Sequence, residues 1–238
     1  SIVLGADGVH SIVAQETERD GLERVAIAQA RVTLPSDCPP DTVRVWFERH
    51  STRFFYWLIP ESKRTAAVGL IADTQAQAKT ALDRFLTTHD LDAIAYQAAS
   101  VPLHPFRPRP LLAGTNGHVL LLGDAAGQVK VTTVGGVVTG MRGGMAAART
   151  ILNESSYEKE LRGLHRELNA HALVRHILDR FTDEDYDQLL DLLNERTLYI
   201  LGQYHRDELT HILFRLLSSQ PRWLFLGARG LVRRLSGR

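Results

Sequence analysis

The chain has 238 residues, of which 44% are hydrophobic, so it is long enough to bury one large core or two small ones. Its 28 basic and 27 acidic residues nearly cancel, which gives no bulk electrostatic reason to expect a nucleic-acid partner. The single cysteine, Cys38, excludes an internal disulfide framework and is typical of a reducing, cytoplasmic location. No segment reaches the run of about 20 apolar residues that a membrane-spanning helix needs.

Residues 1–18 are predicted to form a strand, a turn and a short helix. The apolar strand ends in Gly5-Ala6-Asp7-Gly8, and Ser11 stands where a side-chain cap of the helix belongs. A glycine turn between a strand and a helix start favours a ligand with phosphates or hydroxyls, because turn amides and the helix dipole attract negative charge. Asp7 either contacts such a ligand or is an ordinary turn aspartate.

Period-two alternation in residues 24–71 predicts three or four antiparallel strands. Two of them, 53–59 and 65–71, are separated by a turn at 60–64, and helical spacing follows over 74–88 with Thr74 as its cap. Residues 102–110 are rich in proline and basic residues, which predicts an extended connector back to the first part of the chain.

A second strand and turn is the most informative stretch of the chain. Asn116-Gly117 predicts a hairpin-type turn, followed by the buried strand 119–122 and then by Gly123-Asp124-Ala125-Ala126-Gly127. Gly135-Gly136 precede a predicted helix over 137–150. Asp124 is the strongest candidate site residue, since it can accept a hydrogen bond from a ribose or ribityl hydroxyl. The alternative is a turn aspartate that caps its own loop.

The remainder of the chain is predicted to be helical, over 157–181, 183–204 and 207–218, with Asp183 and Asp207 near helix starts. A short basic and apolar helix follows Pro221. This tail either lies on an anionic membrane surface or packs on the body of the protein. Lys130 either meets a phosphate or developing charge, or is an exposed loop lysine.

The two aspartate motifs, in this order, resemble those of FAD-dependent oxidoreductases of the aromatic-hydroxylase type. The middle of the chain is most similar to the geranylgeranyl reductase branch, through residues 55–60, Val68-Gly69 and 127–133. The resemblance implies an α/β fold with a partial FAD/NAD(P)-binding domain, an inserted antiparallel sheet and a C-terminal helical region. The expected boundaries are 1–18 with 106–155 for the FAD-binding domain, 19–105 for the substrate domain and 156–238 for the helical region.

The resemblance also implies a chemistry, the reduction of carbon–carbon double bonds in a prenyl chain by hydride from reduced FAD. The expected electron donor is NAD(P)H or ferredoxin, and the expected location is cytoplasmic with peripheral membrane contact. No catalytic residue is identified, and scattered histidines make a metal site improbable. The expected cofactor-binding residues are Gly5, Asp7, Gly8, Gly123, Asp124, Ala125, Gly127, Gly135 and Gly136. Phe55, Trp57 and Ile59 share one strand face, which either lines an apolar substrate pocket or packs in the sheet's own core.

The sequence departs from the branch in two ways. Valine stands at 134 where the branch commonly has glycine, and at 131 where it commonly has proline. A β-branched residue does not easily take positive φ, so Val134 argues against tight flavin contact. No Gly-x-Gly-x-x-Gly loop follows a strand, so a truncated or degenerate flavoprotein is expected. The alternatives are a flavin monooxygenase or quinone-linked oxidoreductase, and a non-catalytic remnant that does not bind FAD alone.

Overall fold

The computed structural model describes residues 2–19, 21–110, 119–205 and 207–232, and it divides into two compact units. One unit joins Ser1–Glu23 to Pro102–Arg238, and the other is formed by Arg24–Val101. Each unit is built around hydrophobic clusters of its own. The predicted turn at Asn116-Gly117 lies outside the described residues.

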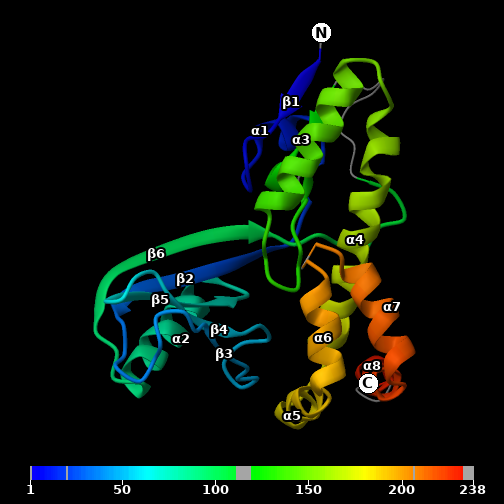
Figure 1. The fold of residues 1–238 in the computed structure, drawn as a ribbon. Helices are drawn as coiled ribbons and strands as arrows, with labels where there is room; N and C mark the ends of the chain where they lie inside the picture. The colour runs from blue at the N-terminus through cyan, green and yellow to red at the C-terminus, as the bar shows by residue number, and fades with distance from the viewer. Residues whose placement is uncertain (1, 20, 111–118, 206, 233–238) are drawn as a thin grey trace. The chain divides into compact units, whose positions relative to one another are not determined.

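The unit formed by residues 24–101 is a five-stranded sheet with one helix (Figure 1). Its strands lie in the order β3-β4-β5-β2-β6, and β2 pairs with β5 and β4 with β5 in antiparallel register. Strand β6 was not predicted, because four of its ten residues are alanine, which carries little strand propensity. The strand bounds are β2 (Arg24–Thr33), β3 (Arg44–Trp46), β4 (Tyr56–Pro60), β5 (Thr65–Ala72) and β6 (Ala93–Pro102).

Helix α2 (Gln75–Thr88) covers one face of this sheet. Thr74 caps it as predicted, accepting a hydrogen bond from the Gln77 amide, while the Gln77 side chain accepts one from the Thr74 amide. The apolar stripe of α2 packs on the alanine-rich face of β2, and Phe85 stacks on Tyr56 with ring centroids 4.4 Å apart. Tyr56 therefore faces the core, and its neighbours Phe55 and Trp57 face the opposite side of the sheet.

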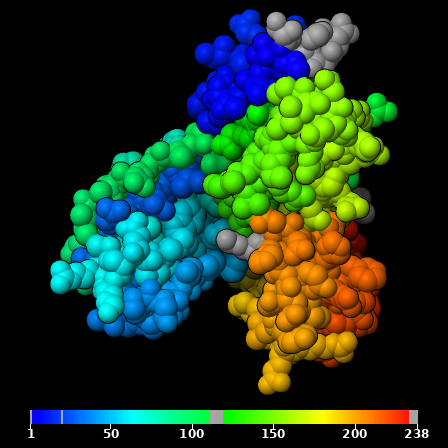
Figure 2. Space-filling model, turned by 45° about the horizontal axis from the view of Figure 1, so that its top comes forward, coloured from blue at the N-terminus to red at the C-terminus, as the bar shows by residue number. Residues whose placement is uncertain are grey.

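The other unit begins with a two-stranded parallel sheet of β1 (Val3–Gly5) and β7 (Val119–Leu121). Each strand leads into a short helical segment, α1 (Ile12–Glu16) after β1 and the 3₁₀ helix η2 (Gly123–Ala126) after β7. Helix α3 (Val137–Ile151) contacts η2. Ala14, Leu121, Ala125 and Ala126 form a small shared core, so the N-terminal segment packs against the segment that follows β7, about 110 residues later in the sequence (Figure 2).

The remainder of this unit is helical, as predicted, with one correction. Residues 183–204 form two helices rather than one, because Asn194 breaks the run and caps the second by accepting a hydrogen bond from the Thr197 amide. Asp207 also lies outside α7, whose N-cap position is Glu208. None of the described helices is long and apolar enough to cross a membrane. The bounds are α4 (Tyr157–Leu178), α5 (Asp183–Asp191), α6 (Glu195–Gln203), α7 (Leu209–Ser219) and α8 (Arg222–Val232).

Candidate functional site

The parallel pairing of β1 with β7 brings the two aspartate motifs to one edge of the small sheet. Gly5 lies opposite Leu121, and the Leu122 amide donates a 2.8 Å hydrogen bond to the Gly5 carbonyl. Because both strands end at this edge, the turns that follow them emerge side by side. This is the carboxyl edge of parallel strands, where α/β proteins bind ligands.

Asp7 is committed to its own turn. Its Oδ2 accepts hydrogen bonds from the amides of Ile12 (2.7 Å) and Val13 (3.2 Å), at the start of α1. The hydrogen bond from the Ser11 side chain, followed by these backbone bonds, lowers the pKa of the Asp7 carboxyl. The adjacent Gly8 has φ +82°, a conformation that favours glycine. The structure therefore shows Asp7 holding the α1 turn, which is the ordinary role considered for it above.

The second turn is compact and needs glycine at both ends. Gly123 and Gly127 have φ values of +57° and +63°, and between them Ala125 is buried. The turn is closed by hydrogen bonds from the Gly127 amide to the Asp124 carbonyl (3.0 Å) and from the Gln128 amide to the Gly123 carbonyl (2.9 Å). A side chain at either glycine would be strained by the left-handed backbone alone.

A buried polar network behind this turn was not found from sequence. The Gly123 amide donates to Gln128 Oε1 (2.8 Å), and the Gln128 Nε2 donates to the Tyr157 hydroxyl (3.4 Å). That hydroxyl donates in turn to the Leu121 carbonyl (2.7 Å), and burial raises the pKa of Tyr157 to about 12. The network fixes the end of β7 and the start of the turn from within the protein.

Helix α3 comes close to this network because of its glycines. A Cβ at Gly143 would lie 2.6 Å from Gln128 Cδ and nearer still to the amide oxygen, and one at Gly140 would lie 3.3 Å from the Gly123 Cα. Glycines 140 and 143 thus allow a helix to pack against a turn at backbone distance. Gly140 and Gly143 therefore have a packing role inside α3.

Asp124 lies beside the start of α3. A Cβ added at Gly136, the N-cap residue, would be 3.0 Å from Asp124 Oδ1, and no side chain caps this helix. The carboxylate is half-buried and accepts no hydrogen bond from the residues that the structure describes. Burial raises its pKa. A partly desolvated carboxylate without a protein donor is well suited to accept hydrogen bonds from ligand hydroxyls.

The segment from Lys130 to Gly135 forms a closed loop before α3. The Lys130 amide donates to the Gly135 carbonyl (3.0 Å), and the Thr133 amide to the Lys130 carbonyl (3.1 Å). Within it Val134 takes φ +47°, the left-handed conformation that is costly for a β-branched residue. The position where the resembled branch commonly has glycine thus has a backbone suited to glycine.

The same loop is held by residues from the helical part of the chain, Asp207 just before α7 and His171 in α4. Lys130 Nζ forms an ion pair of 2.6 Å with Asp207, and the Lys130 side chain is only 10% exposed. The Thr132 hydroxyl lies 2.6 Å from His171 Nδ1 of α4. The expectation of an exposed loop lysine is therefore wrong, because a carboxylate 77 residues later in the sequence neutralises it.

His104 supports the turn from another side and was not identified from sequence. Its Nδ1 lies 2.9 Å from the Gly127 carbonyl, so in the neutral ring Nδ1 is the donor. Burial lowers the pKa of His104 to about 4, which outweighs the opposing effect of the Gly127 bond. His165 stacks edge-on against it with ring centroids 5.4 Å apart. Both histidines are structural, and no cluster of three or more metal-ligating side chains occurs in the described ranges.

The predicted substrate residues lie on the sheet face opposite α2, in the other unit. Trp57 lies across Gly69, where a Cβ would be 2.6 Å from the indole, and its Nε1 donates to Gln29 Oε1 (3.2 Å). Phe55 meets Trp57 edge-on, with ring centroids 6.0 Å apart, and Ile59 is 41% exposed. This face is thus not the one buried under α2.

Three comparisons place the chain among known proteins. No model of a protein family matches it. It is 26% identical over 219 residues to a digeranylgeranylglycerophospholipid reductase of Methanocaldococcus jannaschii, a match that covers 82% of this chain and 55% of the relative. It is 28% identical over 244 residues to digeranylgeranylglycerophospholipid reductase 2 of Methanothermobacter thermautotrophicus, covering 94% and 60%. The chain therefore spans little more than half the length of these relatives.

Solved structures share the fold. A geranylgeranyl bacteriochlorophyll reductase-like protein from Thermoplasma acidophilum aligns with 99% of this chain and 61% of its own, with a TM-score of 0.68 at 19% identity. The flavin-dependent halogenase CmlS aligns with 93% of this chain and 50% of its own, with a TM-score of 0.53 at 16% identity. The predicted resemblance and the predicted flavoprotein fold, with its antiparallel sheet and helical C-terminal region, are confirmed.

Proposed function

We propose that this chain, related in sequence to the digeranylgeranylglycerophospholipid reductases, is part of an FAD-dependent oxidoreductase that reduces double bonds of a prenyl chain. The observation that carries the proposal is Asp124, a half-buried carboxylate without a protein donor among the described residues, beside the uncapped start of α3. Carboxylate and helix amides together fit a ligand that carries both hydroxyls and negative charge.

The residues at the carboxyl edge of β1 and β7 would each hold a different part of FAD. Asp124 would accept a hydrogen bond from a hydroxyl of the ribityl chain or ribose. Gly135 and Gly136 lie at the start of α3, where the free helix amides would face the flavin. Bound FAD would supply the hydride, while the positive end of α3 favours the negative charge of the reduced ring. The turns themselves are formed by Gly5, Asp7, Gly8, Gly123, Ala125 and Gly127.

These proposed roles divide the chain into three functional portions. We assign residues 1–18 and 106–155 to the FAD-binding portion, 19–105 to the substrate portion and 156–238 to a helical region. Phe55, Trp57 and Ile59 provide an apolar sheet face that suits a prenyl chain. NAD(P)H or ferredoxin stays the predicted electron donor. We also infer a cytoplasmic protein with peripheral membrane contact through its C-terminal basic and apolar region.

One observation favours a second candidate function. Val134 occupies a left-handed backbone position in the loop before α3, and its side chain adds bulk at a position where glycine would let a flavin approach. A chain that keeps the fold but does not bind FAD alone would fit this feature. A monooxygenase or quinone-linked enzyme of the same superfamily is the further alternative, supported by the fold shared with a flavin-dependent halogenase.

Flavin affinity of an Asp124→Ala variant tests the proposal. Removing a charge-assisted hydrogen bond of about 1.5–3 kcal/mol should weaken FAD binding by about 10- to 100-fold, measured by quenching of flavin fluorescence. Asp92→Ala, at an exposed position of the other unit, is the matched control and should leave binding unchanged. Equal affinity in both variants would contradict the role of Asp124.

Native mass spectrometry of the protein from its own host separates the candidate functions. A polypeptide that carries FAD, with or without a prenyl lipid, supports the reductase. A polypeptide without flavin supports the second candidate. If the protein oxidises NAD(P)H in the presence of an aromatic acid but does not reduce prenyl chains, the monooxygenase is favoured.

A further inference from the structure

The exposed face of helix α8 is apolar, which is the reverse of an ordinary surface helix. Leu224 and Phe225 are 55% and 76% exposed, and Leu231 and Val232 are 44% and 57% exposed. With the exposed Ala228 they stand at positions i, i+1, i+4, i+7 and i+8, which is one continuous helical stripe. The opposite face, with Leu226 and Gly230, is buried against the protein. We call the five exposed residues the α8 stripe.

Arginines border the α8 stripe along one side. Arg222 and Arg229 lie three residues before and four residues after Phe225, so each is one helical turn away from it. The last 30 residues of the chain contain six arginines and no aspartate or glutamate, while all 27 acidic residues come earlier. The apolar stripe is therefore part of the most positively charged segment of a chain whose total charge is +1.

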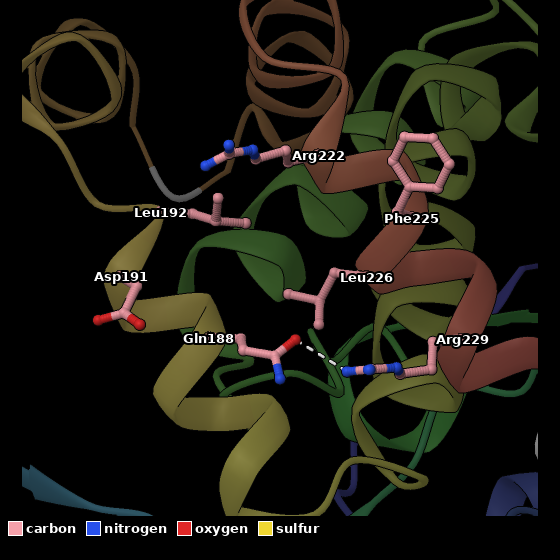
Figure 3. Close-up of a pocket in the computed structure, with 7 residues that line it drawn as sticks. All are labelled: Gln188, Asp191, Leu192, Arg222, Phe225, Leu226 and Arg229. Carbon is pink, nitrogen blue, oxygen red and sulfur yellow. Dashed lines mark hydrogen bonds between the residues drawn. The ribbon is translucent and has the colours of Figure 1, made fainter.

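The two arginines differ in what they are free to bind. Arg229 is held by Asp185 (3.1 Å) and by Gln188 (2.8 Å), the second contact being drawn in Figure 3. The Arg222 side chain makes no hydrogen bond or ion pair with any residue that the structure describes. It lines a pocket of about 500 Å³ between α5 and α8, while Phe225 points away from Leu226 and Gln188. Asp191 lies on the α5 wall, so an anion is best placed on the α8 side.

We propose that the α8 stripe docks on an anionic lipid bilayer, with Phe225 and its apolar neighbours in the acyl boundary and Arg222 on a lipid phosphate. A helix with an apolar face, cationic borders and too little length to span is suited to lie in the plane of a membrane interface. A second copy of the same face is disfavoured, because a symmetric contact would bring arginines against arginines. The inference deepens the proposed membrane contact and does not depend on flavin binding.

Co-sedimentation with sucrose-loaded vesicles tests the docking. The protein should bind vesicles of phosphatidylglycerol and phosphatidylcholine, and bind phosphatidylcholine alone much more weakly. Phe225→Asp should weaken binding by about tenfold or more, because the apolar burial of one large side chain is lost. Arg222→Gln should weaken binding about fivefold, the contribution of one basic residue at an anionic surface, and only with anionic vesicles.

Two variants serve as matched controls. Leu152→Asp changes an apolar residue that is 67% exposed at the end of α3, and Arg162→Gln removes an exposed arginine from α4. Neither should alter vesicle binding. Equal effects of Phe225→Asp and Leu152→Asp would overturn the proposal, as would a concentration-dependent dimer that Phe225→Asp dissociates. Flavin retention is measured on the same samples. If the unmodified protein retains FAD but does not bind anionic vesicles, the docking proposal is refuted and the proposed flavin function is not.

Discussion

Replacing Gly143 with alanine isolates the energetic role of the network behind the Gly123–Gly127 turn. A methyl group at this position overlaps the Gln128 amide, so the Gln128 side chain must leave its place. The partly buried Gly123 amide then loses its 2.8 Å acceptor, and a buried donor without a partner costs about 1–3 kcal/mol. Alanine in a helix interior gives back about 1 kcal/mol relative to glycine.

Gly144 provides the reference for this helix-propensity gain. No atom lies within 4 Å of a Cβ added there, so Gly144→Ala should stabilise the protein by about 1 kcal/mol. Because the gain is common to both variants, the difference between them equals the cost of displacing Gln128. We expect Gly143→Ala to be about 1–3 kcal/mol less stable than Gly144→Ala.

Urea unfolding followed by far-UV circular dichroism measures this difference. In a Gln128→Ala background the overlap is gone, and the two alanine variants should have equal stability. The displaced turn should also weaken FAD binding in Gly143→Ala but not in Gly144→Ala. Equal stability of the two variants with Gln128 present would refute the reasoning, because the helix would then have room that the structure does not show.

Three further predictions concern the surroundings of the turn. Val134→Gly should raise the free energy of unfolding by about 0.5–1 kcal/mol and improve flavin retention, since relief of about 1–2 kcal/mol of left-handed strain exceeds the entropy cost of glycine; unchanged retention would remove the steric argument. His104 has a pKa of about 4 in the folded protein and 6.5 when unfolded, so the unfolded state binds the proton more readily between these values. Stability should fall by roughly 3 kcal/mol as pH decreases from 6.5 to 4, and His104→Gln should flatten that part of the profile in urea titrations. Lys130→Met and Asp207→Asn should each lower the free energy of unfolding by about 1–2 kcal/mol, and the double variant should lose less than the sum of the two. A loss equal to the sum would show that the two side chains do not stabilise each other.

The local elements were accessible from sequence because each depends on neighbouring residues. Alternation predicted strands β2, β4 and β5, and Thr74 predicted the start of α2 through a capping interaction three residues long. The apolar run before Gly123 predicted a buried strand with a glycine turn. Strand β6 was missed because its residues have weak strand propensity. The break at Asn194 was missed because the residues on both sides of it are helical, so the apolar spacing looks like that of one helix.

The sequence by itself determined the order of elements, the two aspartate motifs with their glycines, and the presence of valine at position 134, where the resembled branch commonly has glycine. Only the tertiary structure decided how these parts are used. It shows that Asp7 is occupied by its own helix start while Asp124 accepts no bond from the described residues. It also pairs Lys130 with Asp207 and Gly143 with Gln128. Such contacts join residues far apart along the chain, and their partners are set by packing, which no local periodicity encodes.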